Sequence, residues 1–304
     1  MSPGYLELYK SGELLKRKEL LFKHYTECSL CPHTCKVNRI SEKGICRSGS
    51  TVKIASYNSH HGEEPPISGI NGSGTIFFSG CNGRCIFCQN YPISQLNTGK
   101  EVTDAQLAAI MIELQCRGCH NINLVTPTHF LPSIVHALAI ASEKGLHIPI
   151  VYNSSGYARV EIIQLLDGII DIYLPDIKYA DNTTAYELSG FKNYVDHNRV
   201  ALKEMYKQVG KLKIVDNIAV KGLLVRHLVL PDNLAGTDKS MEFLSREISH
   251  DLHISFMDQY FPAYKAINHE KMSRRISEDE YNISLDFFYA SDLHNGWIQQ
   301  HLEQ

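Results

Sequence analysis

The sequence predicts an α/β protein whose core is a parallel (β/α)6 sheet, curved as a partial TIM barrel. Three observations support this fold class. Short apolar runs alternate with amphipathic helical segments, six such pairs follow one another from residue 74 onward, and the runs are apolar on both faces. Strands buried on both faces are typical of parallel sheets, because the crossover helices cover them.

Six strands and their helices can be placed from these patterns. The strands are expected at residues 75–79, 122–125, 148–152, 169–174, 223–230 and 253–257. Capping boxes mark two helix starts, Thr103 with Gln106 and Ser277 with Glu280, because each pair satisfies two backbone N–H groups. Gly210 is expected to end the helix that follows the fourth strand.

The chain divides into two expected segments. Residues 1–70 are expected to form an irregular Cys-rich extension, with one opening helix at about residues 5–25. The stretch "NSHHGEEPPISGINGSG" near its end has the Gly, Pro and Ser content of a loop. Residues 71–304 are expected to form the barrel core and a C-terminal helical tail that carries the only tryptophan, Trp297.

Composition narrows the class of protein. The chain has 304 residues and a formal net charge of -3, so it offers no strongly basic field for a nucleic-acid backbone. It has neither an apolar run of about 18 residues nor the apolar core of a secretory signal. We therefore expect a cytoplasmic protein with no nucleic-acid or membrane partner. Its nine cysteines are then expected to be thiols or metal ligands.

The loop after the first strand, "FFSGCNGRCIFCQNY", carries three cysteines in a C-x3-C-x2-C pattern: Cys81, Cys85 and Cys88. Thiolates are soft ligands that suit zinc, copper(I) or iron–sulfur clusters. Three thiolates on a four-iron cubane leave one iron open to bind another molecule. Gly80 and Gly83 allow the tight bend that such a core requires. The pattern indicates a catalytic [4Fe–4S] cluster; a zinc knuckle or inert thiols are the alternatives.

Polar segments follow the other predicted strands, at the end where barrel enzymes place their active sites. They are "TPTHF" (126–130), "NSSGY" (153–157), "PDIKY" (175–179), Arg226 with His227, and "DQYFP" (258–262). Because the carboxyl ends of parallel strands meet at one rim, these segments are expected to surround the three thiols. The sequence therefore predicts a catalytic site at this rim.

The segment "GCNGRCIFCQN" in a six-unit β/α core resembles the radical S-adenosylmethionine (SAM) superfamily. More narrowly, the chain resembles relatives of pyruvate formate-lyase activating enzyme, including "CSLCPHTCKVNR" and "GICRSG" near the front. The resemblance implies that the open iron binds the amino and carboxylate groups of SAM. One electron then cleaves the sulfonium, and a 5′-deoxyadenosyl radical abstracts a hydrogen atom. It also implies a low-potential electron donor of the flavodoxin or ferredoxin type.

The resemblance further implies positions for contacts with SAM. Phe87 lies where the family often has an aromatic residue near the adenine, and Asn153 and Ser154 match a position near the ribose. Arg226 matches a basic residue near the methionyl carboxylate, and Gln259 or Tyr260 falls at a contact on the last strand.

Two further segments correspond to the family pattern less simply. Asp176 and Lys178 match an Asp-x-Lys pair near the cofactor. The family usually has a Gly-Gly-Glu-like segment after the second strand, which holds the methionine amino group, whereas this chain has "VTPTH". Hydroxyls or backbone carbonyls of Thr126 and Thr128 are the candidates for that role.

Structural interpretations stand beside these functional ones. Asp176 with Lys178, and Arg226, are alternatively members of buried ion-pair networks that line the barrel. His129 lies in the right loop but could hydrogen-bond a carbonyl instead. His227 alternates to the other face of its strand and is expected in the core.

A second group of thiols lies near the N-terminus in a C-x2-C-x3-C-x10-C pattern: Cys28, Cys31, Cys35 and Cys46. Four thiolates form a closed site, so a metal here is expected to be structural or to transfer electrons. Zinc and a second iron–sulfur cluster are both compatible, with free thiols as the remaining alternative. The segment is expected near the barrel mouth. Cys116 and Cys119 are expected to be ordinary helix-end residues, because an isolated C-x-x-C is a weak redox motif.

The function expected from the whole pattern is a radical SAM enzyme that abstracts hydrogen from a substrate. A glycine of a protein, as in glycyl-radical activation, is one candidate substrate. A peptide or small-molecule maturase and a methyltransferase are alternatives within the class. A non-catalytic metal-binding scaffold for a partner is the alternative outside it.

Overall fold

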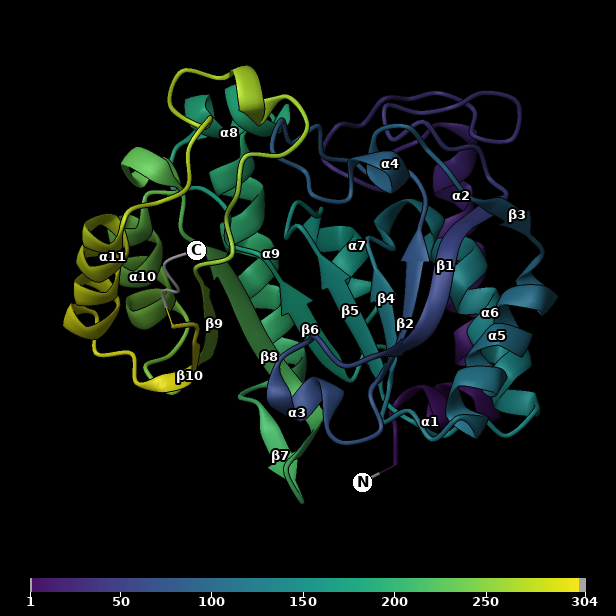
Figure 1. Cartoon of the computed structure of the whole chain (residues 1–304). Coiled ribbons are helices and arrows are strands. Elements are labelled where there is room, and N and C mark those ends of the chain that lie inside the picture. The colour runs from purple at the N-terminus through teal and green to yellow at the C-terminus, as the bar shows by residue number, and fades with distance from the viewer. Residues whose placement is uncertain (1, 301–304) are drawn as a thin grey trace.

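A computed structural model describes residues 2–300 of the chain (Figure 1). Within them, a ten-stranded sheet has the order β10-β9-β8-β6-β5-β4-β2-β1-β3, with β7 paired to β8. The parallel centre consists of β2 (Ser73–Phe78), β4 (Ile122–Val125), β5 (Ile150–Ser154), β6 (Ile172–Pro175), β8 (Ile218–Leu228) and β9 (His253–Met257). These are the six predicted strands, paired in sequence order. The sheet is not closed, so the predicted partial barrel is confirmed.

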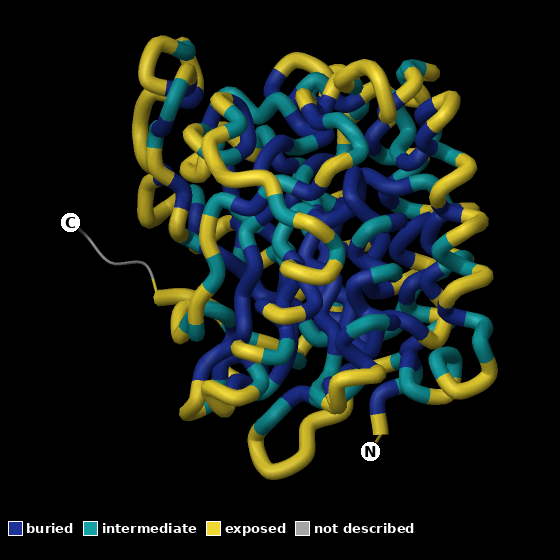
Figure 2. Tube along the Cα trace, turned by 90° about the vertical axis from the view of Figure 1, so that its right-hand side faces the viewer, coloured by how far each residue is buried: buried dark blue, intermediate teal, exposed yellow. Residues whose placement is uncertain are grey.

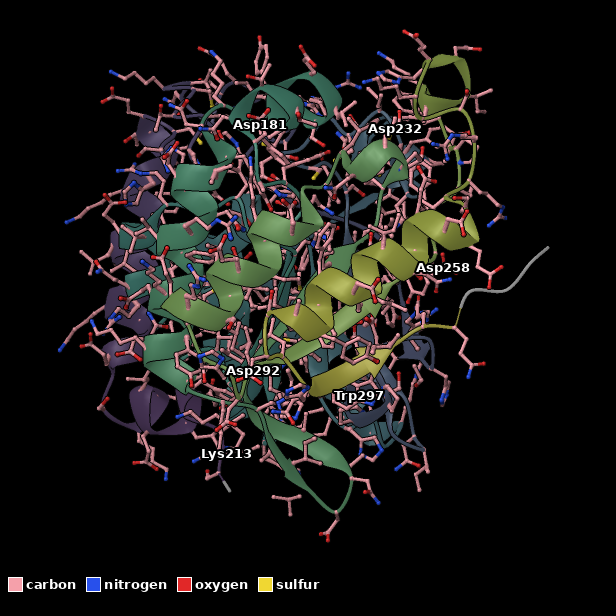
Figure 3. The ribbon with its side chains drawn as sticks, turned by 90° about the vertical axis from the view of Figure 1, so that its left-hand side faces the viewer. Asp181, Lys213, Asp232, Asp258, Asp292 and Trp297 are labelled. Atoms are coloured by element: carbon pink, nitrogen blue, oxygen red, sulfur yellow. The ribbon has the colours of Figure 1, made fainter. Side chains whose placement is uncertain are left out.

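Helices cover the outer face of the sheet. They include α5 (Asp104–Cys116), α6 (Leu131–Glu143), α7 (Val160–Gln164), α9 (Tyr194–Val209), α10 (Thr237–Glu247) and α11 (Glu278–Ala290). Both predicted capping boxes are present, at α5 and α11, and Gly210 follows the last residue of α9. Figure 3 shows α10 and α11 across the outside of β8 and β9. The central strands are buried and the outer helix faces exposed (Figure 2).

The predicted N-terminal extension is more regular than expected. Two helices, α1 (Tyr5–Lys10) and α2 (Glu13–Thr26), replace the single predicted one, because Gly12 between them has a left-handed backbone with φ of 73°. After an irregular stretch, β1 (Val52–His60) runs antiparallel to β2 and pairs on its other side with β3 (Lys100–Val102). The extension therefore contributes a strand to the barrel sheet itself.

The segment after β1 crosses the inner face of the sheet and ends in the short helix α3 (Pro65–Ser68) (Figure 1). Ile67 of α3 belongs to a small apolar cluster with inward-facing residues of the sheet, among them Val151, Ile172 and Leu224. A much larger cluster lies between the sheet and the outer helices. Residues before the predicted core thus fill the lower part of the barrel interior.

The chain after Phe288 differs from the expected helical tail. Helix α11 ends at Ala290, and β10 (Asn295–Ile298) then pairs parallel with β9, where Trp297 lies opposite Ser255. The remaining elements are α4 (Tyr91–Ser94), α8 (Asn182–Ser189) and β7 (Lys213–Val215). Residue 1 and residues 301–304 of the two predicted segments lie outside the described part. No described helix is long and apolar enough to cross a membrane.

Candidate active site

A cavity of about 440 Å³ opens among the carboxyl ends of the parallel strands. The thiols of Cys81, Cys85 and Cys88 all line it. Eight of the predicted cofactor contacts line it as well: Phe87, Thr126, Asn153, Ser154, Asp176, Lys178, Arg226 and Gln259. Segments far apart in the sequence therefore meet at one rim, as parallel strand topology requires.

The three-cysteine loop is held by hydrogen bonds to its sulfurs. The Gly83 N–H donates to Cys81 Sγ at 3.2 Å, and Ser189 Oγ donates to Cys85 Sγ at 3.0 Å. A Cβ at Gly83 would lie 2.8 Å from the Phe191 ring and 3.5 Å from Cys85 Sγ. The loop path therefore requires glycine at this position, beside one of the thiols.

The donor set is one that an iron–sulfur cluster takes. Cys81, Cys85 and Cys88 line one open cavity, and thiolates are soft ligands that suit such a cluster. A [4Fe–4S] cluster held by these three thiolates would leave one iron without a protein ligand.

A buried ion triad borders the cavity, and two of its members, Arg226 and Glu63, line it. Arg226 Nε lies 2.7 Å from Glu64 Oε1, its Nη2 lies 2.9 Å from Glu64 Oε2, and Nη2 also donates to Glu63 Oε2. The side chains are 17% exposed for Arg226, 7% for Glu63 and 5% for Glu64. Burial opposes ionisation of Glu64, but the Arg226 charge outweighs it and holds the pKa of Glu64 below its usual value.

Sequence analysis did not find Glu63 and Glu64. They lie in the segment taken only as a loop, which the structure carries across the barrel interior to Arg226. One signal was available, because an arginine on the inner face of a barrel strand needs counter-charges. Two adjacent carboxylates before "PP" were candidates, although nothing in the local sequence places them inside the barrel.

Asp176 and Lys178 form a second ion pair in the cavity. Their Oδ2 and Nζ atoms are 2.7 Å apart, and both side chains are 19% exposed. Burial favours the neutral amine, but Asp176 outweighs it and raises the pKa of Lys178. Lys178 also interacts electrostatically with Cys85, so a fixed positive charge lies beside the thiol loop.

The "VTPTH" segment divides into two parts with different surroundings. Thr126 lines the cavity, its N–H donates to the Asn153 carbonyl at 2.8 Å, and its φ is 60°. A left-handed backbone is costly for a β-branched residue and easy for glycine. Thr128 does not line the cavity. Its buried hydroxyl lies 2.8 Å from Tyr152 Oη, so the structure does not bring this predicted contact to the site.

The last strand supplies Gln259 rather than Tyr260 to the cavity wall. The Tyr260 ring packs edge-on against Phe87 at 5.9 Å, and its hydroxyl donates to the Met272 carbonyl at 2.6 Å. Gln89 of the thiol loop donates to the Gln259 carbonyl at 3.0 Å. The loop after β9 is thereby fastened to the thiol loop.

His129 and His227, the two histidines considered from the sequence, are structural. Buried His129 bonds the Ser79 carbonyl through Nε2 at 2.9 Å, and burial lowers its pKa to about 3. His227 contacts the Ile177 carbonyl at 2.8 Å and Thr237 Oγ1 at 2.9 Å, on the outer face of β8 as predicted.

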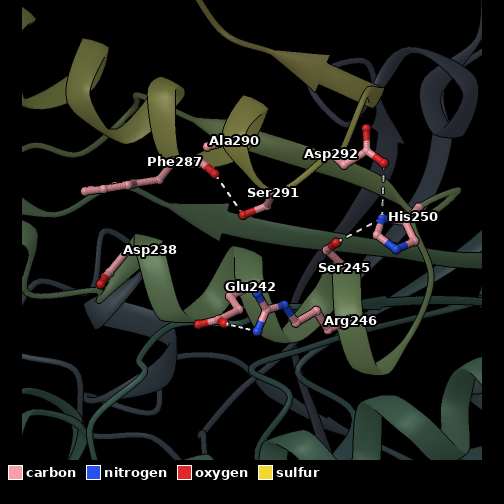
Figure 4. Close-up of a pocket in the computed structure, with 9 residues that line it drawn as sticks. All are labelled: Asp238, Glu242, Ser245, Arg246, His250, Phe287, Ala290, Ser291 and Asp292. Atoms are coloured by element: carbon pink, nitrogen blue, oxygen red, sulfur yellow. Dashed lines mark hydrogen bonds and ion pairs between the residues drawn. The ribbon is translucent and has the colours of Figure 1, made fainter.

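Two other features lie outside the site. Cys116 is exposed and Cys119 is buried beside Ser59 Oγ at 3.1 Å; neither is in a disulfide. A surface groove of about 310 Å³ lies between α10 and α11, where His250 contacts Ser245 and Asp292 (Figure 4). It is open and far from the strand ends that carry the thiols.

Comparison with known proteins decides the family. The sequence model of the Radical SAM superfamily matches residues 75–222. A protein of Methanocaldococcus jannaschii, "Uncharacterized protein MJ0674", is 32% identical over 296 residues, which cover 92% of this chain and 80% of the relative. The chain belongs to the radical SAM superfamily. It is therefore an enzyme of the class that uses a [4Fe–4S] cluster and SAM for radical chemistry.

Other similarities to this radical SAM protein are partial. Pyruvate formate-lyase-activating enzyme of Clostridium pasteurianum is 27% identical over 161 residues, which cover 51% of this chain and 61% of the relative. The solved structure described as TYW1 with a lysine-pyruvate adduct bound has a TM-score of 0.44 and 13% identity, and the match covers 73% of this chain and 74% of that one.

Proposed function

We propose that this radical SAM protein holds a [4Fe–4S] cluster on Cys81, Cys85 and Cys88, cleaves SAM there, and removes a hydrogen atom from a protein or peptide substrate. One observation carries the proposal: three thiols of one loop and the polar ends of the other inner strands line a single cavity. A scaffold without catalysis would not need an open fourth ligand position beside them.

The bound cluster and SAM supply the reductive cleavage of a sulfonium and the 5′-deoxyadenosyl radical. The chain's own residues bind and orient. We assign the methionine amino group to the Thr126 region, since its left-handed backbone matches what a glycine-rich segment would adopt. We assign the ribose hydroxyls to Asn153 and Ser154 of the next strand and the adenine to Phe87, all of which line the cavity.

Arg226 is the residue best placed for the methionyl carboxylate. Glu63 and Glu64 hold its Nε and Nη2 atoms, so the guanidinium plane is fixed. Its Nη1 has only a long contact of 3.5 Å to Asn153 Oδ1 and remains able to donate into the cavity. A rigid, always-charged donor suits carboxylate recognition.

The proposed substrate class rests on one named relative. The Clostridium pasteurianum relative is named for activation of pyruvate formate-lyase, and the similarity covers half of this chain. A protein glycine is therefore our first candidate, and peptide maturation or methyl transfer is second. The nine free thiols fit a reducing compartment such as the cytoplasm, and a flavodoxin- or ferredoxin-type donor would supply the electron.

Electron paramagnetic resonance tests the cofactor arrangement directly. The reduced, anaerobic protein should give a [4Fe–4S]+ signal that changes shape when SAM is added, because SAM would bind the open iron. Cys85→Ala should abolish this SAM-sensitive signal, whereas Cys116→Ala, which changes an exposed thiol outside the site, should leave it. A strong cluster signal that ignores SAM in the unaltered protein would contradict the proposal.

A further inference from the structure

We propose that Cys28, Cys31, Cys35 and Cys46 hold a second [4Fe–4S] cluster, and that this cluster passes electrons to the cluster of the three-cysteine loop. The relay rests on the proposed function, whereas the identity of the second cluster does not. Three observations support the proposal: the convergence of the thiols, a buried cation beside them, and their contact with the first loop.

The four thiols converge within an irregular segment, residues 27–51. The Cys31 thiol interacts electrostatically with those of Cys28, Cys35 and Cys46. A Cβ at Gly44 would lie 3.2 Å from Cys35 Sγ and 3.5 Å from Cys46 Sγ, so a larger residue there would intrude between the thiols. Backbone hydrogen bonds from Cys28 N to Val37 O and from Lys36 N to Cys28 O fold the segment back on itself.

A buried cation lies beside the thiols. Arg39 is 1% exposed, its Nη1 donates to Cys28 Sγ at 3.7 Å, and its Nη2 donates to the carbonyls of Gly49 and His129. Among residues 2–300, no atom forms a hydrogen bond with its Nε. A buried guanidinium whose oxygen partners are neutral is costly unless negative charge lies close by. Four thiolates on a cluster supply that charge, and hydrogen bonds to the sulfurs tune a redox centre.

The four-cysteine segment lies directly against the three-cysteine loop. A Cβ at Gly80 would lie 2.5 Å from the Cys46 carbonyl, and the ring of His33 contacts the Asn82 carbonyl at 2.7 Å. Arg84 interacts electrostatically with both Cys46 and Cys81, so one side chain lies close to both thiol groups. Electron transfer between two clusters requires such proximity.

The opposite side of the segment faces solvent. Thr34, Lys36, Ile40 and Ile45 are exposed around the half-buried Cys31 and Cys35. A low-potential one-electron protein donor can approach here. The donor would give one electron to the second cluster. That cluster would pass the electron to the cluster of the three-cysteine loop and return to its oxidised state. The cluster of the three-cysteine loop would then use the electron to reduce the sulfonium of SAM. No bond forms or breaks in the relay.

Metal analysis of the anaerobically reconstituted full chain tests the identity of the site. We expect about eight irons per chain, four for each cubane cluster, and no stoichiometric zinc. A Cys31→Ser/Cys35→Ser variant should keep about four irons and the SAM-sensitive resonance signal. A Cys81→Ser/Cys85→Ser/Cys88→Ser variant should keep the other cluster, reducible but insensitive to SAM. One zinc per chain, or an iron count that the first variant leaves unchanged, would overturn the proposal.

The relay is tested by comparing electron sources. Loss of Cys31 and Cys35 should slow deoxyadenosine formation at least tenfold more with a reduced flavodoxin-type donor than with dithionite, which can reach the first cluster directly. Equal losses with both sources would overturn the relay. Two clusters without any deoxyadenosine would instead contradict the proposed function and leave the second site standing.

Two substitutions of Arg39 test the position of the second cluster without removing any of its proposed ligands. Arg39→Lys keeps the charge, and Arg39→Gln removes it beside the second cluster. We expect both to retain both clusters and only Arg39→Gln to lower the reduction potential of the SAM-insensitive one, with Lys213→Gln, at an exposed lysine of β7, as the control. Unchanged potential in Arg39→Gln would contradict the placement of the cluster beside this guanidinium.

Discussion

The guanidinium of Arg226, which lines the cavity, and the carboxylate of Glu64 meet through two hydrogen bonds of 2.7 and 2.9 Å. Arg226 comes from an inner strand of the barrel, whereas Glu64 comes from the segment that crosses its interior. This pair ties the N-terminal third of the chain to the site. It also leaves one guanidinium nitrogen directed toward Asn153.

Replacing Arg226 should separate binding of SAM from assembly of the cluster. Arg226→Lys keeps a positive charge but loses the fixed fork, so we expect SAM affinity to fall about tenfold, or about 1.4 kcal/mol, with iron content unchanged. Titration of the resonance signal with SAM measures this affinity. Arg246→Lys, at an exposed ion pair on α10, is the control and should have no effect. Equal affinity in Arg226→Lys would remove the residue from the SAM site.

The pair of Asp176 and Lys178 should show strong coupling in stability. Asp176→Asn leaves a buried ammonium unpaired, so we expect a loss of about 3 kcal/mol in the free energy of unfolding. The double variant Asp176→Asn/Lys178→Met should lose less free energy of unfolding than the sum of the losses in the two single variants. Thermal unfolding of the unaltered protein, the two single variants and the double variant measures this coupling. Additive losses would show that the 2.7 Å contact contributes little.

Thr126→Gly distinguishes between a backbone and a hydroxyl role. Glycine adopts the observed φ of 60° without the cost that a β-branched residue bears, so we expect unchanged or slightly raised stability, by up to about 1 kcal/mol, and unchanged SAM affinity. Thr128→Gly should instead destabilise, since it loses the buried contact with Tyr152. A large loss of SAM affinity in Thr126→Gly would assign the role to the hydroxyl.

Buried His227 should make the fold sensitive to mild acid. Burial lowers its pKa to about 4 despite the opposing contact with the Ile177 carbonyl. Its unfolded pKa is about 6.5, so the unfolded chain takes up the proton first and stability falls as pH drops through this range, by about 1.4 kcal/mol per unit. His227→Asn should be less stable at pH 7 but show a shallower fall in thermal midpoint between pH 7 and 5. Parallel pH profiles would contradict this account.

Much of this architecture was predictable because it depends on local pattern. Apolar runs and capping boxes placed the six parallel strands and the starts of α5 and α11, and the alternation of side chains placed Arg226 inside and His227 outside. Strand-end position alone brought eight predicted residues to the cavity. Such features follow from the period of a strand or helix and need no knowledge of distant contacts.

The features that were missed depend on long-range packing. Strand β1 has mixed exposure and lies next to the edge strand β3, so its pattern is weak. Glu63 and Glu64 reach the site only because their segment crosses the barrel, a path fixed by contacts with residues about 160 positions away. Thr128 does not line the cavity for a local reason, because a short helical turn directs its hydroxyl toward Tyr152.

The most direct test of the central claim is formation of 5′-deoxyadenosine from SAM by the reconstituted, reduced protein under anaerobic conditions. The account predicts a product that depends on reductant and disappears in Cys85→Ala, while Cys116→Ala matches the unaltered protein. A fully loaded cluster that yields no deoxyadenosine would contradict it, and would point to a metal-binding scaffold or to another cofactor at the open iron.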